Sequence, residues 1–357
     1  MYKMKNVIIM ISIIFTTFLN ANQENVTQEN PTLKSTTLEN ITQESPTQEN
    51  TINIIHEKTT LDEAAANNII ENDTKVKEEI LKNEILPNTY NPDDILVGFY
   101  GRPYSKVLGI LGELSIDDLT KKMKVVKKEY EAISNGVKIV PTYHIIKDIA
   151  TLESGNDYDH IKPLNELLIM KYINRAQKEN FAVILDVQLG TMTPIEAVEP
   201  ILKFLKYPNV HIAVDPEFKI PKHRKYPPGK LIGHIFAKDV NEVQEAMQNY
   251  MIKNHIEGKR MLLIHMFYER MLRNKSLVKK YDRINLTYNI DGHGRGSTKI
   301  KIYNSLYNKD ANKVAQGGFK IFYKNDKKPL MTPKQILGLE PVKGRIIWTK
   351  PNYINYH

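Results

Sequence analysis

The sequence contains no cysteine among its 357 residues. This excludes disulfides, a thiolate nucleophile, thiolate metal ligands and the acylation site of a lipoprotein. Tryptophan occurs once, at Trp348. The apolar run from Val7 to Leu19 is shorter than the roughly 18 residues of a membrane-spanning helix. Any catalytic or metal-binding group in this sequence therefore uses oxygen or nitrogen atoms of side chains.

The N-terminal segment predicts export. Residues 1–21 combine a short basic start at Lys3 and Lys5 with the apolar run and a polar end near Asn20. This is the pattern of a cleaved signal peptide, with an uncleaved membrane anchor as the alternative. Either interpretation puts the rest of the chain outside the cytoplasm, secreted or periplasmic.

Two segments separate this leader from the main domain. Residues 22–59 repeat a polar phrase, as in Thr27-Gln28-Glu29-Asn30 and Thr47-Gln48-Glu49-Asn50. Such a tract buries too little apolar surface to offset chain entropy, so we expect a disordered tether. Residues 60–94 form a lead-in, in which a loose apolar stripe over 60–86 predicts a short helix that Thr60 could cap.

Positive charge is in excess but dispersed. The net charge is +9, yet the nearest approach to a basic block is His223-Arg224-Lys225 or Lys327-Lys328. We interpret the excess as solvated surface that favours an anionic wall polymer or lipid face, which would allow peripheral association with the cell envelope. Nucleic acid is not an expected partner of an exported chain.

From residue 95 to residue 357, short β-rich runs alternate with amphipathic segments. We expect strands at 95–100, 137–144, 181–187, 209–215, 260–266, 283–290, 317–323 and 345–349. Nearly continuous Val, Ile and Leu in such runs indicates burial on both faces of a parallel sheet. Eight strand–helix units in this length predict an α/β fold of the (β/α)8 TIM-barrel type, and an open doubly wound sheet is the alternative.

Polar and aromatic residues gather where these strands end. The carboxyl ends of barrel strands form the site in TIM-barrel enzymes, whereas Lys138 and Arg260 stand at strand starts. The residues at or just after the strand ends, in chain order, are Tyr100, Arg102, Tyr143, His144, Asp186, Gln188, Asp215, Glu217, His265, Tyr288, Asp291, His293, Tyr323 and Trp348. This pattern predicts an active or binding site at one mouth of the barrel.

Several of these residues also have a structural interpretation. Asp186 could tie down a loop by accepting backbone N–H groups, and His265 could be a core histidine. Trp348 could be core rather than a sugar platform. Gly292, Gly294 and Gly296 resemble a phosphate loop, but without a basic residue at the required spacing we interpret them as turn glycines beside Asp291 and His293.

The pair Asp215-Pro216-Glu217 is more specific. Residues i and i+2 of a strand point to one side, so the two carboxyl groups should lie close together. One of two neighbouring carboxylates is driven toward its protonated form while the other stays charged, a division of labour that glycosidic cleavage requires. The structural alternative makes Asp215 a cap and Glu217 a surface residue.

Motifs spread over about residues 97–350 resemble an uncharacterised family of secreted bacterial barrel proteins. They are Gly109-Ile110-Leu111-Gly112-Glu113, Pro141-Thr142-Tyr143-His144-Ile145-Ile146, Leu185-Asp186-Val187-Gln188-Leu189-Gly190, Asp215-Pro216-Glu217-Phe218, His265-Met266-Phe267, Asp291-Gly292-His293-Gly294 and Gly317-Gly318-Phe319-Lys320. The resemblance implies the barrel fold and the location of the site, but no particular activity.

A looser resemblance is to barrel glycosidases of amino-sugar polymers, the family 18 chitinases and family 25 muramidases. Asp215 and Glu217 match the Asp-x-Glu that ends their fourth strand. The resemblance implies that Glu217 is the acid, that Asp215 steadies the substrate, and that Tyr288 and Trp348 hold the sugar. The chain departs from the chitinases upstream, where it has His211 and Ala213 in place of further aspartates.

Three functions stay open. The first is a glycoside hydrolase without a cofactor, acting on a cell-envelope or extracellular polysaccharide through Glu217, Asp215, Asp186 and Asp291. The second is a hydrolase of the phosphodiesterase or deacetylase type that uses a divalent metal ion. Its ligands would come from His144, Asp186, Asp215, Glu217, His265, Asp291 and His293. The third is a non-catalytic barrel that binds a glycan or a wall protein.

Overall fold

The structure is a computed structural model that describes residues 77–78, 85, 90–155, 157–223 and 226–357. The predicted signal peptide, the predicted tether and most of the predicted 60–94 lead-in lie outside these residues. Within the described part of the chain, no helix is long and apolar enough to cross a membrane.

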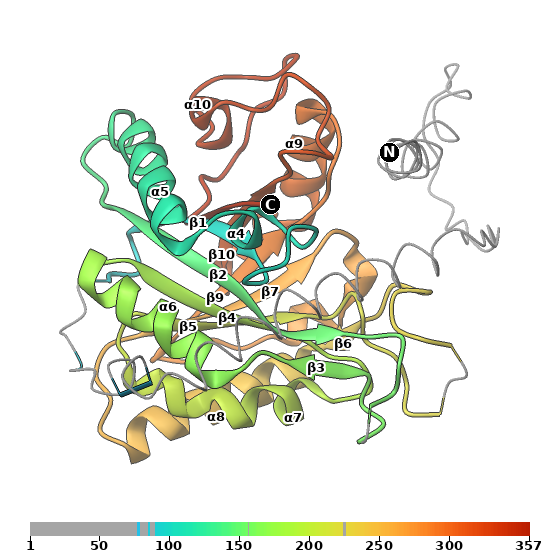
Figure 1. Ribbon diagram of the computed structural model, residues 1–357. Helices are drawn as coiled ribbons and strands as arrows, with labels where there is room; N and C mark the ends of the chain where they lie inside the picture. Colours follow the sequence, from blue (N-terminus) through green and yellow to red (C-terminus); the bar gives the residue numbers. More distant parts are fainter. Residues whose placement is uncertain (1–76, 79–84, 86–89, 156, 224–225) are drawn as a thin grey trace, which may run out of the picture. The chain divides into compact units, whose positions relative to one another are not determined.

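Eight parallel strands close into a barrel (Figure 1). They are β1 (Ile95–Gly101), β2 (Ile139–Ala150), β4 (Ala182–Gln188), β5 (Val210–Asp215), β7 (Arg260–Met266), β9 (Ile284–Ile290), β10 (Gln316–Ile321) and β11 (Tyr353–Tyr356). Each pairs with the next in this order, and β11 pairs with β1, which also pairs with β2. The predicted (β/α)8 fold is therefore confirmed, and an open sheet is ruled out by the β1–β11 pairing.

Helices lie between the strands and around the barrel (Figure 1). They are α4 (Ile110–Glu113), α5 (Ile116–Glu131), α6 (Glu166–Glu179), α7 (Pro194–Val198), α8 (Ala237–Lys253), α9 (Gly296–Leu306) and α10 (Pro333–Ile336). Short 3-10 segments span Glu199–Lys206, Glu269–Met271, Lys275–Leu277 and Ala311–Lys313. Three short strands complete the fold: β3 (Ile161–Pro163), antiparallel to β2, and the pair β6 (Ile235–Phe236) and β8 (Leu272–Arg273).

The two faces of each strand meet different environments, because successive side chains point to opposite sides. Outward residues such as Val97 and Phe99 join the large apolar cluster shared with the helices. Inward residues form a separate small cluster, which comprises Leu96, Val140, Ala182, Ile184, Ala213, Met261, Leu263 and Tyr353. Polar residues that point into the barrel lie above and below this apolar layer. Alternation along each strand determines which of its side chains point into the barrel.

The strand starts carry structural contacts, as predicted for Lys138 and Arg260. Arg260 is buried at the first position of β7, and its Nη2 donates to the Leu205 carbonyl oxygen at 2.9 Å. Inside this end of the barrel, Nδ1 of the buried His211 accepts the Met261 N–H at 3.1 Å. Tyr90 packs edge-on against the His211 ring at 4.7 Å and closes the barrel there. These contacts stabilise the fold at the end of the barrel opposite the predicted site.

The last strand differs from its prediction. Residues 345–349 were expected to form it, but β11 spans Tyr353–Tyr356, and Trp348 is 74% exposed in the preceding segment. The run Arg345-Ile346-Ile347-Trp348 has strong β propensity, yet it buries only Ile347. Its position is decided by tertiary packing, which overrides local propensity. The other seven strands begin within two residues of their predicted starts, and β2 extends six residues further than expected.

Candidate active site

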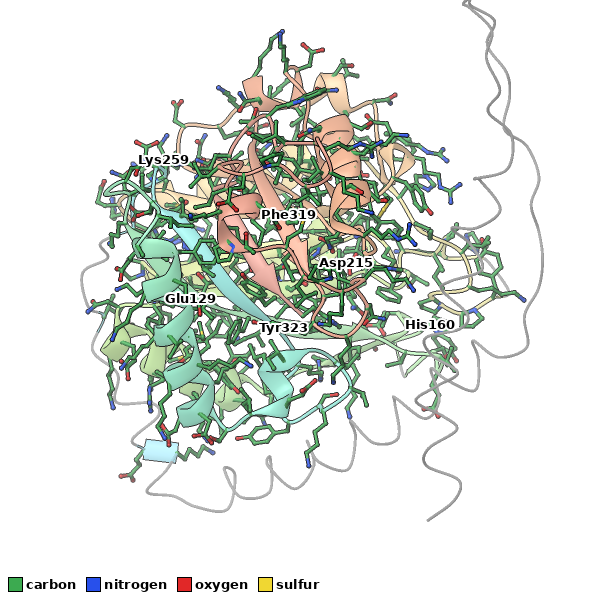
Figure 2. The ribbon with its side chains drawn as sticks, turned by 90° about the horizontal axis from the view of Figure 1, so that it is seen from above. Glu129, His160, Asp215, Lys259, Phe319 and Tyr323 are labelled. Atoms are coloured by element: carbon green, nitrogen blue, oxygen red, sulfur yellow. The ribbon has the colours of Figure 1, made fainter. Side chains whose placement is uncertain are left out.

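Polar side chains from five barrel strands and from the residues just after them converge at the carboxyl end of the barrel. Histidines come from β2 and β7, and carboxyl groups come from β4, from the end of β5 and from the residue after β9. Figure 2, seen from above, labels Asp215 near the middle of the view, whereas Glu129 of α5 lies toward one side. The site is therefore assembled from residues far apart in the sequence, as in TIM-barrel enzymes generally.

His265 bridges two of the carboxylates. Its Nδ1 lies 2.5 Å from Oδ2 of Asp291, and its Nε2 lies 3.2 Å from Oδ2 of Asp186. Burial opposes the charged ring, but the two carboxylates raise the pKa of His265 well above its usual value. The charge of His265 in turn keeps the pKa values of Asp186 and Asp291 below that of a free carboxyl group, although burial opposes this. Both carboxylates are therefore ionised at neutral pH.

His144 approaches Asp186 from β2. Its Nε2 lies 3.3 Å from Oδ2 of Asp186, and its Nδ1 lies 2.6 Å from the Tyr353 hydroxyl. Burial lowers the pKa of His144 to about 4, despite the neighbouring Asp186. The His144 ring is therefore neutral at pH 7. Asp186 lies next to two imidazole rings, the neutral ring of His144 and the charged ring of His265.

Lys320 supplies a second cation to the cluster. Its Nζ lies 3.3 Å from Oδ2 of Asp291 and 3.9 Å from the centre of the Tyr100 ring. Asn289, inward-facing on β9, donates to Oδ1 of Asp291. Asp291 thus contacts a histidine, a lysine and an amide, and these contacts fix the orientation of its carboxylate.

Asp215 and Glu217 form a second pair of carboxyl groups, but only Asp215 belongs to β5, and Glu217 stands in the turn that follows, so the alternation of side chains along a strand does not bring them together. The Glu217 N–H donates to Oδ1 of Asp215 at 2.9 Å. Burial, reinforced by Asp186 and Asp291, raises the pKa of Asp215 to about 6. Burial and the adjacent Asp215 raise the pKa of Glu217 to about 8. Glu217 is half-buried and Asp215 is buried, so the protonated carboxyl group is the more accessible of the two.

The cluster contains seven of the predicted residues and three that were not predicted. Asp186, Asp215, Glu217, His265 and Asp291 interact with one another electrostatically, and His144 and Tyr100 lie against them. Lys320, Tyr353 and Asn289 were not predicted. Each lies on the same face of its strand as a neighbouring inward residue two positions away, such as Gly318 for Lys320, so parity along the strand could have found them.

Tyr143 and Tyr288 point out of the barrel rather than toward the site. The Tyr143 hydroxyl meets Thr120 Oγ1 of α5 at 2.5 Å, and its ring packs against Tyr172 of α6. Tyr288 is fully buried in the apolar cluster between strands and helices. Their prediction as residues that face the site was wrong, and with it the role of Tyr288 as a sugar contact, because each precedes an inward residue by one position and so faces the opposite side.

The side chains of Arg102 and Gln188 form hydrogen bonds with backbone groups near the end of β2. The Arg102 guanidinium donates to the carbonyl oxygens of Ile146, Lys147 and Pro163 at 3.1–3.2 Å. Gln188 Oε1 accepts the Ala150 N–H at 2.8 Å. Both side chains connect the irregular end of β2 to its neighbours, and these contacts account for their burial at the strand ends.

Tyr323 and Trp348 also lie away from the cluster. Tyr323 stacks on Tyr356 at 5.2 Å and lies beside the outward-facing Phe99. Trp348 is exposed and precedes the closing strand, so neither predicted role, core residue or sugar platform on a strand, fits its position. The prediction for Trp348 failed because the last strand begins at Tyr353, five residues after Trp348, and not at residue 345.

The glycine-containing segment after β9 is fixed by a buried ion pair. Lys299 Nζ lies 2.9 Å from Asp326 Oδ2 and donates to the Gly292 carbonyl oxygen at 2.8 Å. The Gly294 N–H donates to Asp326 Oδ1 at 2.9 Å, with a positive φ of 136° that favours glycine. Gly292 and Gly294 lie in the turn, as predicted, whereas Gly296 is the first residue of α9. The half-buried His293 packs against Phe322.

One group of side chains in the cluster has the composition of a metal site. Ligand atoms of His144, Asp186 and His265 all lie within 4.8 Å of one another, and all three residues are buried. Two imidazoles and one carboxylate suit a divalent transition metal such as Zn²⁺.

Comparison with known proteins finds distant structural similarity alone. No family model matches the chain, and no curated protein matches it. A hyperthermophilic endo-β-1,4-glucanase in complex with substrate aligns over 74% of this chain and 88% of its own, with 10% identity and a TM-score of 0.39. A tri-modular GH5 (subfamily 4) endo-β-1,4-glucanase from Bacillus licheniformis complexed with cellotetraose aligns over 66% of this chain and 49% of its own, with 11% identity and a TM-score of 0.35.

Proposed function

We propose that this protein is a glycoside hydrolase that cleaves a polysaccharide by carboxylate acid–base catalysis. The proposal rests on four carboxyl groups that meet at one end of the barrel: the Glu217 N–H lies 2.9 Å from Oδ1 of Asp215, and His265 lies between Asp186 and Asp291 at 3.2 and 2.5 Å. The pKa shifts agree with this arrangement. The carboxyl cluster is divided into two ionised members, Asp186 and Asp291, and two members with raised pKa values, Asp215 and Glu217. A protonated acid beside a charged carboxylate is the arrangement that glycosidic bond cleavage requires.

Glu217 is the general acid in this proposal. It holds its proton at neutral pH, and it is the more accessible member of its pair. Its proton would pass to the glycosidic oxygen as the bond to the leaving sugar breaks. Asp215 would act beside it as an orienting group, because its Oδ1 accepts the Glu217 N–H and so fixes the backbone that carries the acid.

Asp291 is the ionised carboxylate with access to a substrate. Its side chain keeps 10% of its surface exposed, whereas that of Asp186 keeps none. Asp291 would therefore stabilise the positive charge that develops on the sugar ring or activate the attacking group. Asp186 would act as a positioning residue that holds His265, and through it Asp291.

An exposed aromatic ring follows the carboxyl end of β7. Tyr268 is 48% exposed two residues after Met266 and packs against Phe267 at a ring distance of 4.9 Å. The Arg270 guanidinium also lies over the Tyr268 ring, 5.1 Å from its centre, so a sugar that packs on this ring would share its surface with Arg270. We assign to Tyr268 the platform role that was predicted for Trp348.

The proposed substrate is a cell-envelope or extracellular polysaccharide. This extension follows from the export signal expected over residues 1–21 and from the excess of positive charge, which suits a polymer with anionic groups. Both properties come from the sequence, and export is proposed on the same basis.

The decisive experiment compares the purified full chain with two variants on β-glucan, chitin and peptidoglycan fragments. Glu217→Gln should lower kcat on the cleaved substrate by about a hundred- to ten-thousandfold, since the amide keeps the shape but supplies no proton. Glu242→Gln, on the exposed face of α8, is the matched control and should cleave at the wild-type rate. Saturable glycan binding without any product from the wild-type chain would replace this proposal with a binding barrel.

A further inference from the structure

We propose that His144, Asp186 and His265 form a binding site for one divalent transition-metal ion of the Zn²⁺ type. The three residues come from β2, β4 and β7 and meet inside the barrel, below the half-buried Glu217. This inference goes beyond glycoside hydrolysis and does not depend on it, because it concerns binding of an ion by these three side chains.

The first support is that the facing atoms are buried without adequate partners. Nε2 of His144, Nε2 of His265 and both oxygens of Asp186 are inaccessible to water and make no hydrogen bond of acceptable geometry with the described residues. Exposure of the three side chains is 0%, 1% and 0%. Native proteins rarely leave several buried polar atoms facing one another in this way, and an unplaced ion is one of the ordinary explanations.

The second support is the spacing. Nε2 of His144 lies 3.3 Å and Nε2 of His265 lies 3.2 Å from the same oxygen, Oδ2 of Asp186. Ligands about 2.0–2.2 Å from a zinc ion lie roughly 3.0–3.6 Å apart in tetrahedral or octahedral arrangements. Both distances fall in this range, and all three ligand atoms lie within 4.8 Å of one another, so an ion bound to all three would draw the two histidine nitrogens toward it.

The third support is that the other ring nitrogens are already held. Nδ1 of His265 lies 2.5 Å from Asp291 Oδ2, and Nδ1 of His144 lies 2.6 Å from the Tyr353 hydroxyl. Metal-binding histidines usually donate their second N–H to a carboxylate or another oxygen, which fixes the tautomer and points the lone pair at the ion. Both histidines have such a partner, and both point their second nitrogen at the same carboxylate.

The charge balance also suits a cation. Asp186 and Asp291 bring two negative charges to the histidine pair, and Lys320 offsets one of them through its contact with Asp291. The competing occupant of the space between His265 and Asp186 is a proton on Nε2. A metal ion would displace that proton and compensate the same carboxylate, so the two states exclude each other.

The test is a metal titration of the untagged full chain after treatment with a chelator. Zn²⁺ binding is measured by calorimetry, and Co²⁺ is used as a spectroscopic probe, because nitrogen and oxygen coordination gives it visible absorption bands. We expect one Zn²⁺ per chain. Asp186→Asn and His144→Gln should weaken binding at least about a hundredfold, since each removes a direct ligand.

Two further variants keep the result interpretable. His211→Gln replaces another buried barrel histidine, at the opposite end, and should bind Zn²⁺ like the wild-type chain. Tyr353→Phe removes the outer partner of His144 without touching a ligand and should weaken binding about ten- to a hundredfold. It therefore tests the site even if the ligand variants fail to fold. Absence of stoichiometric Zn²⁺ or Co²⁺ binding by the folded wild-type chain, or equal binding by Asp186→Asn, would overturn the site. Neither result would affect the Glu217 experiment, which reports on sugar cleavage.

Discussion

The hydroxyl of Tyr353 on β11 lies 2.6 Å from Nδ1 of His144 on β2, and it reaches that nitrogen across the face of Gly98 on β1. A Cβ at position 98 would stand 2.6 Å from the same hydroxyl, closer than real Cβ atoms approach oxygen. Gly98 therefore allows the contact between the closing strand and the candidate site.

Gly98→Ala should destabilise the fold by about 1–3 kcal/mol through overpacking. Urea denaturation followed by circular dichroism measures the change in the free energy of unfolding. In the double variant Gly98→Ala/Tyr353→Phe the loss should be smaller than the sum of the two single losses, because the nearest clashing atom is gone. Simple additivity would show that the hydroxyl does not limit space at position 98.

The raised pKa of Glu217 predicts the alkaline limit of activity. A general acid works only while protonated, so kcat/KM should fall as the pH rises through about 8. The pH profile of the wild-type chain checks this on the substrate identified above. An alkaline limb that persists unchanged in the residual activity of Glu217→Gln would assign it to another group.

The same pKa has a consequence for stability. A carboxyl group whose pKa is higher in the folded than in the unfolded chain stabilises the fold below its unfolded pKa, and this contribution is lost as the pH rises toward the folded value. For Glu217 the window runs from the ordinary glutamate pKa of 4.5 to a pKa of about 8. Glu217→Gln should therefore be more stable than wild type at pH 9, on the order of 1–3 kcal/mol, with a smaller difference at pH 5. Thermal unfolding at both pH values measures it.

Two exposed aromatics distinguish the proposed sugar platform from the predicted one. Tyr268→Ala should raise KM for a polysaccharide about tenfold while leaving stability within about 0.5 kcal/mol. Trp348→Ala should change neither, since Trp348 is 74% exposed and lies outside the cluster. A higher KM in the Trp348 variant alone would restore the sequence-based interpretation.

A variant of Arg102 distinguishes a structural role of this residue from a role in substrate binding. Arg102→Met should cost about 3–5 kcal/mol, because three backbone carbonyl groups lose a buried charged donor. The fraction that remains folded should keep the wild-type KM, measured in steady-state kinetics at low temperature. A selective rise in KM with normal stability would return Arg102 to the binding site.

The fold and the central carboxylates could be predicted because both depend on local patterns. Buried parallel strands read as apolar runs, and the end of such a run marks the mouth of the barrel, which is how Asp186, Asp215 and Asp291 were found. Their clustering needed no knowledge of side-chain contacts, since strand direction alone brings the ends together.

The predictions that failed concerned which face of a strand a residue occupies and which distant segments pack against it. Tyr143 and His144 are adjacent on one strand, so only one of them can face the barrel, yet both were predicted to do so. Lys320 was overlooked because lysines are ordinarily exposed, whereas here Asp291 and the Tyr100 ring compensate its burial. The short strand Tyr353–Tyr356 has less β propensity than residues 345–349, and its place is set by the two strands between which it pairs.

The pairing of β11 also determines when the barrel can close. β11 pairs with Leu96–Phe99 of β1 on one side and with Gly318–Ile321 of β10 on the other. Until residues 353–356 have left the ribosome, both of those strands present unpaired backbone edges, which are templates for intermolecular pairing. Closure of the barrel therefore depends on residues 353–356, and a change that kept them from pairing would leave the edges of β1 and β10 open to pairing between molecules.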